Sequence, residues 1–483
     1  MTEPLDCLII GAGFSGLCMA SMLQRRGMHR FVLLEQAAEL GGTWRDNHYP
    51  GAECDVPSAL YSYSFDNKTD WDYQWSEQPQ ILSYIRSVAH RRDLERHIRC
   101  NCRVIAANYQ EEAGLWQVEL ADGELLQARF LVSAVGQLHR PHIPDIAGLG
   151  DFGGPCFHSS RWDHNISFIG KTVGVIGNAA SAVQFIPHVA EKASQLKIFQ
   201  RSANWVSEKR DRPYRDWEKT LLRCFPFIKK AARLKTYLRN EMFVYPAMRG
   251  NRLMAKLIRL GCLAYLDRSI DDAELRRKLT PDYPVGAKRI LVASGYYEAL
   301  ARDNVTLLTD TITRVDAAGV QTEAGHVACD ILILGTGFVT NPFLSEIEVT
   351  GRRAKRLADH WQVGATAYLG VATNAFPNLF FLYGPNTNLG HNSILLMVEA
   401  QAKYLVQAIA AAMGGKNATI EVLRDVERRY NEALQRRLNG MVWNRIDASW
   451  YKSGGLITNN WPGSVGEYRR AMKRFDPADY LLS

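Results

Sequence analysis

A strand, a glycine-rich turn and a helix follow one another at the start of the chain, and this unit constrains the fold more than any other feature. The apolar run 8–10 leads into Gly11-x-Gly13-x-x-Gly16, and a helical apolar pattern follows. The three glycines permit a tight turn, close approach of a pyrophosphate, and close helix–strand packing. Glu35, 24 residues after Gly11, ends the next apolar run, where a carboxylate binds a ribose hydroxyl. The unit predicts a Rossmann-like dinucleotide-binding domain.

A second strand–turn–helix unit lies in the middle of the chain, with an arginine where the first unit has a glutamate. The turn is now Gly177-x-Ala179-x-x-Ala182, and the position 24 residues after Gly177 carries Arg201. A carboxylate would repel a ribose 2′-phosphate, whereas a guanidinium binds it with paired hydrogen bonds, so this unit predicts NADPH rather than NADH. The alternative is that Arg201 is an ordinary surface arginine. The methyl group of Ala179 predicts a looser or shifted approach of the pyrophosphate.

Composition narrows the function classes. The chain has a formal net charge of +8, but its basic residues form no tail, and no nucleic-acid reader motif is present, so we expect no nucleic-acid partner. Nine scattered cysteines show neither metal spacing nor the CxxxxC pair of disulfide reductases, which predicts reduced thiols and no metal site. An early strand leaves no room for a signal peptide, and no apolar run is long enough for a membrane helix. A cytoplasmic protein is expected.

The segment "DFGGPCFHSSRWD", which joins the two nucleotide units, is a loop in its local pattern. It fits F-x-G-x-x-x-H-x-x-x-W-D at every defined position, with the matching residues Phe152, Gly154, His158, Trp162 and Asp163. In this fingerprint the chain resembles the Baeyer–Villiger monooxygenases, which are class B flavin-dependent monooxygenases. Related enzymes that oxidise nitrogen and sulfur typically carry another residue in place of the tryptophan. The resemblance implies that His158 couples the domains rather than acting as an acid or base.

Further segments carry the resemblance in the same order along the chain. The segments "GGTWRDNHYPGAECDV", "FQRS", "YPVGAKRI", "GPNTNLGHNS" and "DASWY" are similar to cofactor-contacting segments of the family. The resemblance implies FAD contacts at Gly11, Gly13, Gly16, Glu35, Thr43, Trp44, Asp55, Tyr61 and Val104. It implies NADP contacts at Gly177, Asn178, Ser181, Arg201, Ser202, Lys288 and Trp450, with Trp450 on a mobile lid.

The chemistry implied by the resemblance is that of an oxidoreductase. NADPH reduces FAD, the reduced flavin forms a C4a-peroxyflavin with dioxygen, and this adduct inserts oxygen beside the carbonyl of a small hydrophobic ketone, giving an ester or lactone. Arg289 would stabilise negative charge because a guanidinium does not lose its proton, and Asp55 would hold it in place. Two alternatives stay open: a sulfide- or amine-oxidising flavin monooxygenase, and a non-oxygenating NADPH-binding flavoprotein with a decayed second site.

The length of 483 residues predicts two or three domains. The fold class is α/β, with two Rossmann-like domains for FAD and NADP and a helical insertion. The insertion is dense in basic and apolar residues, a pattern typical of a solvated helical face. The alternatives are that it lines a substrate tunnel or makes weak peripheral contact with a membrane. The expected parts are an FAD-binding domain at 1–145 and 329–483 with the C-terminal lid, a fingerprint linker at 146–165, an NADP-binding domain at 166–206 and 281–328, and the insertion at 207–280.

Overall fold

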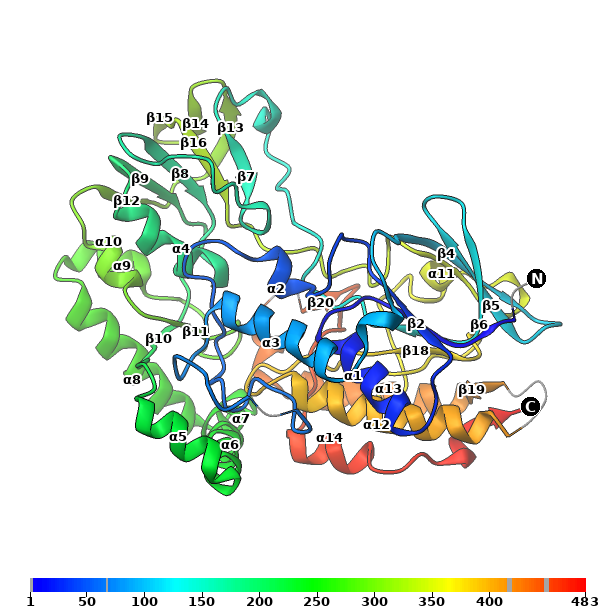
Figure 1. The fold of residues 1–483 in the computed structure, drawn as a ribbon. Helices are drawn as coiled ribbons and strands as arrows, with labels where there is room; N and C mark the ends of the chain where they lie inside the picture. The colour runs from blue at the N-terminus through cyan, green and yellow to red at the C-terminus, as the bar shows by residue number, and fades with distance from the viewer. Residues whose placement is uncertain (1–2, 67, 415–418, 447–450) are drawn as a thin grey trace.

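Two β-sheets, one for each glycine-rich unit, form the frame of the molecule (Figure 1). The computed structural model describes residues 3–66, 68–414, 419–446 and 451–483. The larger sheet has eight strands in the order β17-β4-β5-β6-β1-β2-β3, with β18 beside β6. Its strands are β1 (Leu5–Ile10), β2 (Phe31–Leu34), β3 (Ile98–Arg99), β4 (Val104–Gln110), β5 (Leu115–Leu120), β6 (Leu125–Ser133), β17 (Glu348–Thr350) and β18 (Leu379–Phe381).

The second sheet is entirely parallel and has five strands in the order β12-β9-β8-β16-β7. These are β7 (Cys156–His158), β8 (Thr172–Ile176), β9 (Gln195–Phe199), β12 (Val305–Leu308) and β16 (Ile331–Leu334). Two sequence expectations need correction here. The fingerprint segment is not only a loop, because three of its residues pair with β16 as an edge strand. The domain boundary at residue 329 is also wrong, because β16 pairs with β8 along its whole length.

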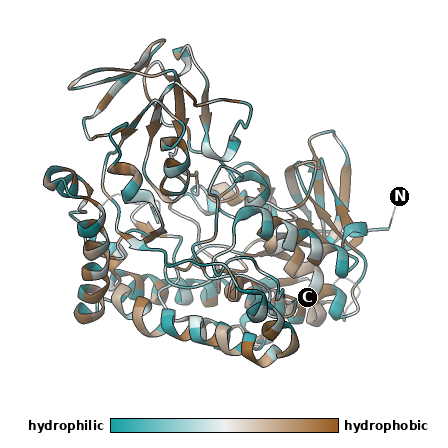
Figure 2. Ribbon diagram, turned by 60° about the vertical axis from the view of Figure 1, so that its left-hand side comes forward, coloured by the Kyte–Doolittle hydropathy of each residue, from teal (hydrophilic) through white to brown (hydrophobic). Residues whose placement is uncertain are grey.

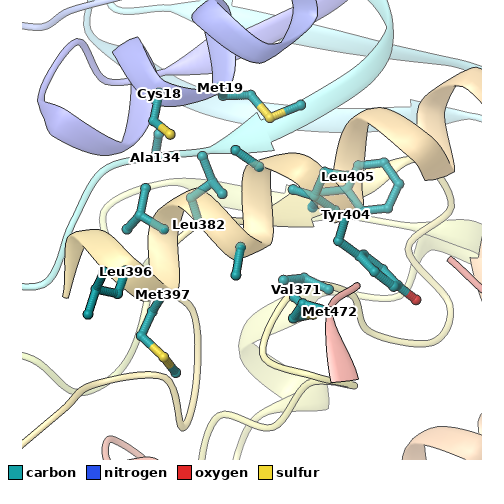
Figure 3. Close-up of a cluster of buried hydrophobic side chains, with 14 of the residues drawn as sticks. Cys18, Met19, Ala134, Val371, Leu382, Leu396, Met397, Tyr404, Leu405 and Met472 are labelled. Carbon is teal, nitrogen blue, oxygen red and sulfur yellow. The ribbon is translucent and has the colours of Figure 1, made fainter. Parts of the chain in front are cut away.

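The largest hydrophobic core lies around α1 (Phe14–Arg25) and α12 (Leu395–Ala412), which pack together on the eight-stranded sheet. Figure 3 shows part of this core, with Cys18 and Met19 of α1 on one side of α12 and Met397 extending from its other side. The second sheet has a separate core, covered by α4 (Ala180–Ala190) and α10 (Tyr296–Leu300). In Figure 2 the strands of both sheets are mainly hydrophobic. Buried parallel strands require this pattern because helices cover both of their faces.

Most of the segment 207–280, predicted as a helical insertion, forms helices, and it projects at the lower left of Figure 1. It contains α5 (Asp216–Cys224), α6 (Pro226–Arg239), a π-helical turn η4 (Asn240–Val244), α7 (Tyr245–Met248), α8 (Arg252–Ser269) and α9 (Ala273–Leu279). At its base β10 (Val206–Glu208) pairs with β11 (Leu291–Ala293). Among the described residues no helix is both long and apolar enough to cross a bilayer.

The remaining elements are short or lie at the edges of the two cores. The helices are α2 (Thr43–Asp46), α3 (Gln78–Arg91), α11 (Leu357–His360), α13 (Arg424–Asn439) and α14 (Val465–Ala471). A three-stranded antiparallel sheet extends the second domain, with β13 (Ile312–Asp316), β14 (Gly319–Thr322) and β15 (Gly325–Ala328). Two small strand pairs lie near the C-terminus, formed by β19 (Ile420–Val422) with β22 (Tyr480–Leu482) and by β20 (Lys452–Ser453) with β21 (Leu456–Ile457).

The linker glycine Gly154 is expected to be essential for stability, because a Cβ atom there would lie 2.1 Å from the carbonyl oxygen of Asp330. Backbone cannot yield as a flexible side chain would, so Gly154→Ala should lower the free energy of unfolding by about 2 kcal/mol. Gly150→Ala is the matched control, because nothing lies within 4 Å of the added methyl group there. Thermal unfolding monitored by circular dichroism tests this. Equal melting temperatures for the two variants would contradict the close contact.

Candidate functional site

One large cavity of about 1220 Å³ is walled by both glycine-rich turns. It brings together predicted residues that are far apart in the sequence and come from both nucleotide units. Of the predicted site residues, those that line it are Gly11, Gly13, Glu35, Thr43, Trp44, Asp55, Tyr61, Val104, Gly177, Asn178, Ser181, Arg201, Ser202, Lys288 and Arg289. Trp450 lies outside the described residues.

The first glycine-rich turn presents an open helix terminus to the cavity. Gly11 has φ of +106°, and a Cβ there would lie 2.7 Å from the carbonyl oxygen of Ala134. Gly16 lies beneath the turn, where a Cβ would be only 2.0 Å from the carbonyl oxygen of Gly11. Helix α1 starts after Gly13 with no side-chain cap and no acidic residue in its first turn. Its first N–H groups and its positive dipole end are therefore available to an anion.

Glu35 directly follows β2 and is a buried carboxylate with fixed partners. Its oxygens accept hydrogen bonds from the backbone N–H groups of Ala12 and Ala37, each at 3.1 Å. They also accept one from Arg45 at 2.9 Å, and this ion pair is largely buried. Sequence reasoning missed Arg45, although it lies directly after Thr43 and Trp44 in a segment already singled out. The ion pair holds the carboxylate at the cavity wall.

The second glycine-rich turn repeats the geometry of the first. Gly177 has φ of +105°, and a Cβ there would meet the carbonyl oxygen of Gly335 at 2.4 Å. Ala179 has φ of −85° and ψ of −163°, against −86° and −163° for Gly13, so its methyl group causes no backbone strain. Helix α4 also begins with no side-chain cap and no acidic first turn. Asn178 anchors the turn through a hydrogen bond of 2.7 Å to Gln200.

Two cations lie beside this second turn without a carboxylate partner. Lys288 donates a hydrogen bond of 3.0 Å to the hydroxyl of Ser202, and burial together with nearby Arg201 lowers the pKa of its ammonium group. Neither Arg201 nor Lys288 forms an ion pair with any acidic residue in the described ranges. Like charges held together beside a hydroxyl donor favour binding of an anion with more than one negative charge.

Arg289 and Asp55 form an ion pair at the wall of the cavity. The Arg289 Nε donates a hydrogen bond of 2.7 Å to Asp55 Oδ2, and Nη2 lies 2.5 Å from the same oxygen. Attraction to Asp55 raises the pKa of the guanidinium above its ordinary value, although desolvation opposes this. The Arg289 side chain is 31% exposed, so part of it stays accessible from the cavity. The arrangement supplies a permanent, oriented positive charge.

A polar loop after β18 completes this wall and connects it to the insertion. Asn388, Leu389 and Asn392 line the cavity, and the carbonyl oxygen of Leu389 lies 3.5 Å from Arg289 Nη1. Glu241, in the π-helical turn of the insertion, accepts hydrogen bonds from Asn392 at 3.0 Å and from Val465 N–H at 3.2 Å, and contacts buried His391 Nε2 at 3.1 Å. Burial of Glu241 opposes ionisation, but these bonds lower its pKa. Sequence spacing carries no signal for this contact.

The fingerprint residues do not line the cavity. His158 Nδ1 accepts a hydrogen bond from Ser160 N–H at 3.1 Å, which leaves Nε2 to donate to the carbonyl oxygen of Gly337 at 2.9 Å. Trp162 is buried, with its ring near those of Tyr49, Phe157, Phe168 and Phe185. Phe152 packs against the second sheet, and Asp163 accepts a hydrogen bond from the N–H of Asn165. The bond from His158 ties the linker to the segment that follows β16.

The bonding of His158 predicts a pH-dependent contribution to stability. Burial lowers the pKa of the His158 imidazole, so the folded state holds the neutral form. A folded-state pKa below the unfolded value means that this contribution is complete above about pH 6.5 and is lost as the pH falls through that value. At alkaline pH the free energy of unfolding of His158→Gln should therefore be about 1–2 kcal/mol below that of the wild type. This difference between the two proteins should become smaller at acidic pH.

Melting temperatures of wild type and His158→Gln across this pH range test the prediction. His90→Gln serves as the control, because the side chain of His90 is 79% exposed. A difference that stays constant with pH would show that protonation of His158 is not linked to folding.

Comparisons with known proteins agree with this geometry. A family model described as pyridine nucleotide-disulphide oxidoreductase matches residues 8–223. A Baeyer-Villiger monooxygenase from Pseudomonas aeruginosa is 39% identical, covering 98% of this chain and 91% of its own. An FAD-binding monooxygenase, ktnD, from Aspergillus niger is 38% identical, covering 98% and 81%.

Solved structures of monooxygenases are also similar to this chain over its full length. A steroid monooxygenase bound to NADP superposes with a TM-score of 0.89 at 31% identity over 99% of both chains. The closed crystal structure of cyclohexanone monooxygenase has a TM-score of 0.89 at 28% identity over the full length of both. The nine cysteines of the chain are all free thiols. The chain belongs to the Baeyer–Villiger monooxygenase family.

Proposed function

We propose that the protein is an FAD-containing, NADPH- and O2-dependent monooxygenase that inserts one oxygen atom beside the carbonyl of a small hydrophobic ketone, giving an ester or lactone. The observation that carries this proposal is the Arg289–Asp55 ion pair in the wall of a cavity that both glycine-rich turns share. Membership of the family supports it, and so do similar solved structures of a monooxygenase in complex with FAD and NADP.

The residues around the first turn fit FAD. The open N-terminus of α1 would hold the pyrophosphate, and Glu35 would accept hydrogen bonds from a ribose. Trp44 donates a hydrogen bond of 3.0 Å from its indole N–H to the hydroxyl of Tyr61, which fixes both rings. The other residues proposed to contact FAD are Gly11, Gly13, Gly16, Thr43, Asp55 and Val104.

The residues around the second turn fit NADPH. The open N-terminus of α4 would hold its pyrophosphate, next to Gly177, Asn178 and Ser181. Arg201, Lys288 and Ser202 would hold the ribose 2′-phosphate, because they offer two cations and a hydroxyl with no competing carboxylate. The strain-free backbone at Ala179 argues against decay of this site.

The residues of the chain would promote oxygen insertion by positioning and charge. Bound FAD supplies electron transfer from NADPH and the activation of dioxygen. Arg289 would stabilise the negative charge that develops on the ketone oxygen, because its position and its protonation are fixed in advance. Asp55 orients the guanidinium and compensates its charge, which would cost several kcal/mol if the arginine were left unpaired inside the protein.

Arg289→Ala is expected to lower ester or lactone formation by about 100- to 1000-fold, because it removes the fixed cation. The FAD-loaded protein is supplied with NADPH, ¹⁸O2 and linear, cyclic and aryl ketones, and products are analysed by mass spectrometry. The expected product carries one ¹⁸O atom. Arg210→Ala is the control, because Arg210 is 85% exposed. Oxidation of sulfides or amines without any ester would instead favour the heteroatom-oxidising alternative.

If NADPH does not reduce the bound flavin whereas dithionite does, the non-oxygenating alternative is supported. Anaerobic reduction followed by absorbance of the flavin answers this question separately from product formation. Arg289→Ala is expected to keep its FAD and its reduction by NADPH, so a loss of both would indicate misfolding rather than loss of the reaction.

Arg201→Ala is expected to weaken binding of 2′,5′-ADP by about 10- to 100-fold while leaving 5′-AMP unchanged, because only the first ligand carries the 2′-phosphate. Isothermal titration calorimetry measures both. The affinity for 2′,5′-ADP should fall as pH rises through the lowered pKa of Lys288, since the phosphate binds the charged ammonium. Lys288→Arg should remove this decrease. Equal losses for both nucleotides would place Arg201 elsewhere than at the 2′-phosphate.

A further inference from the structure

The positive charge of the molecule is concentrated in the helical insertion. The stretch from α5 to α8, residues 216–269, contains twelve basic and four acidic residues, so its formal charge of +8 equals that of the whole chain. The acidic residues do little to offset it at the surface. Glu218 is paired with Arg212, and Glu241 is turned inward toward His391.

Exposed apolar side chains gather in the same stretch. Ten of the nineteen large hydrophobic side chains that are exposed in the described part of the chain belong to it. Phe227 is 66% exposed and Trp217 is 60% exposed, whereas soluble surfaces normally present such residues singly. We call the following residues the insertion face: Trp217, Phe225, Phe227, Leu234, Leu238, Met242, Phe243, Leu253, Leu257 and Leu260.

Helical spacing places these side chains in stripes that point away from the protein. In α6, Phe227 is followed seven and eleven positions later by exposed Leu234 and Leu238, and this spacing keeps them on one side of the helix. The other side of α6 is anchored, because Arg233 donates hydrogen bonds to the carbonyl oxygens of Ala59, Leu60 and Ser62. The apolar stripe of α6 therefore has no partner within the described part of the chain.

Helix α8 has the same organisation. Leu253, Leu257 and Leu260 are exposed at spacings of four and three residues, whereas Cys262 and Leu266 are buried against the body of the protein. Phe225 and Phe227 meet edge-on at the junction of α5 and α6, with ring centroids 5.8 Å apart, and both are exposed. Figure 1 shows α5, α6, α7 and α8 together at one corner of the molecule.

Exposed cations are interspersed with these apolar residues. None of them forms an ion pair with an acidic residue within the described part of the chain, and two lie over aromatic rings. They are Arg223, Lys230, Lys235, Arg239, Arg249, Arg252, Lys256 and Arg259. Apolar side chains bordered by unpaired cations match a surface that offers both hydrocarbon and negative charge.

We propose that the insertion face docks on the surface of a lipid bilayer that contains anionic lipids. The lipid headgroups would neutralise the cations, and the acyl boundary would take up the aromatic and leucine side chains. A second copy of the chain fits poorly, because a two-fold contact would set the same positive charges against each other. A nucleic acid would satisfy the cations but would leave the leucines exposed to water.

The insertion face also lies close to the site described above. Met242 and Phe243 of the face belong to the π-helical turn whose Glu241 binds the cavity loop through Asn392. Docking would thus bring one side of the cavity near the bilayer. The inference goes beyond the proposed function and does not depend on it, because the test below measures binding and not turnover.

Vesicle flotation of the FAD-loaded protein tests the proposal. Vesicles of phosphatidylcholine alone are compared with vesicles that also contain phosphatidylglycerol, at low and high NaCl concentration. We expect the protein to float with the anionic vesicles, to bind neutral ones at least about tenfold more weakly, and to dissociate in high salt. Phe225→Ser with Phe227→Ser should weaken binding to anionic vesicles by about tenfold or more. Lys230→Gln and Lys256→Gln should each weaken it by about fivefold.

Matched controls come from two exposed positions on the second nucleotide domain. Ile169→Ser and Lys171→Gln alter an exposed apolar residue and an exposed cation outside the insertion face, and neither should change vesicle binding. Brominated lipid should quench part of the tryptophan fluorescence of the wild type but less of it in Trp217→Phe. Absence of flotation with anionic vesicles would overturn the proposal. A dimer by light scattering that the double phenylalanine variant disperses, without vesicle binding, would make a second copy the occupant.

Discussion

Two helices begin at the wall of one cavity with no side chain to cap either of them, and the arrangement of the site depends on this. An open helix N-terminus leaves N–H groups without partners, which is unfavourable unless water or an anion supplies acceptors. Positive φ angles at Gly11 and Gly177 place both turns in the same conformation, each pressed against a backbone carbonyl of the neighbouring segment. The chain thereby places two open helix N-termini at the wall of one cavity.

Site residues were easiest to predict from the sequence where they belong to a short motif with a defined backbone conformation. Gly11, Gly177, Glu35 and Arg201 were predictable because a turn and the residue 24 positions later belong to one supersecondary unit. The residues that line the cavity could be named in advance largely through the family resemblance, since no spacing rule places Asp55 beside Arg289. Their proximity comes from the packing of two domains.

The features that escaped prediction rest on contacts between distant segments. The edge strand β7 has three residues, and its pairing is decided by β16 rather than by its own pattern. The contact of Glu241 with His391 joins positions 150 residues apart, in the insertion and in a loop after β18. The boundary expected at residue 329 also depends on such a contact. Hydrogen bonding to β8 assigns β16 to the second sheet, so that sheet continues past residue 329.

The Arg289–Asp55 ion pair depends on the contact between the two nucleotide-binding units. Asp55 belongs to the first nucleotide unit and Arg289 to the second, so the pair spans the junction between them. Any rotation that separated the two units would pull the carboxylate from the guanidinium and change the electrostatic field at the cavity wall. The ion pair is therefore a property of the two domains in contact and not of either domain alone. A contact between two domains of one chain thus fixes the orientation of the guanidinium that we propose to be catalytic.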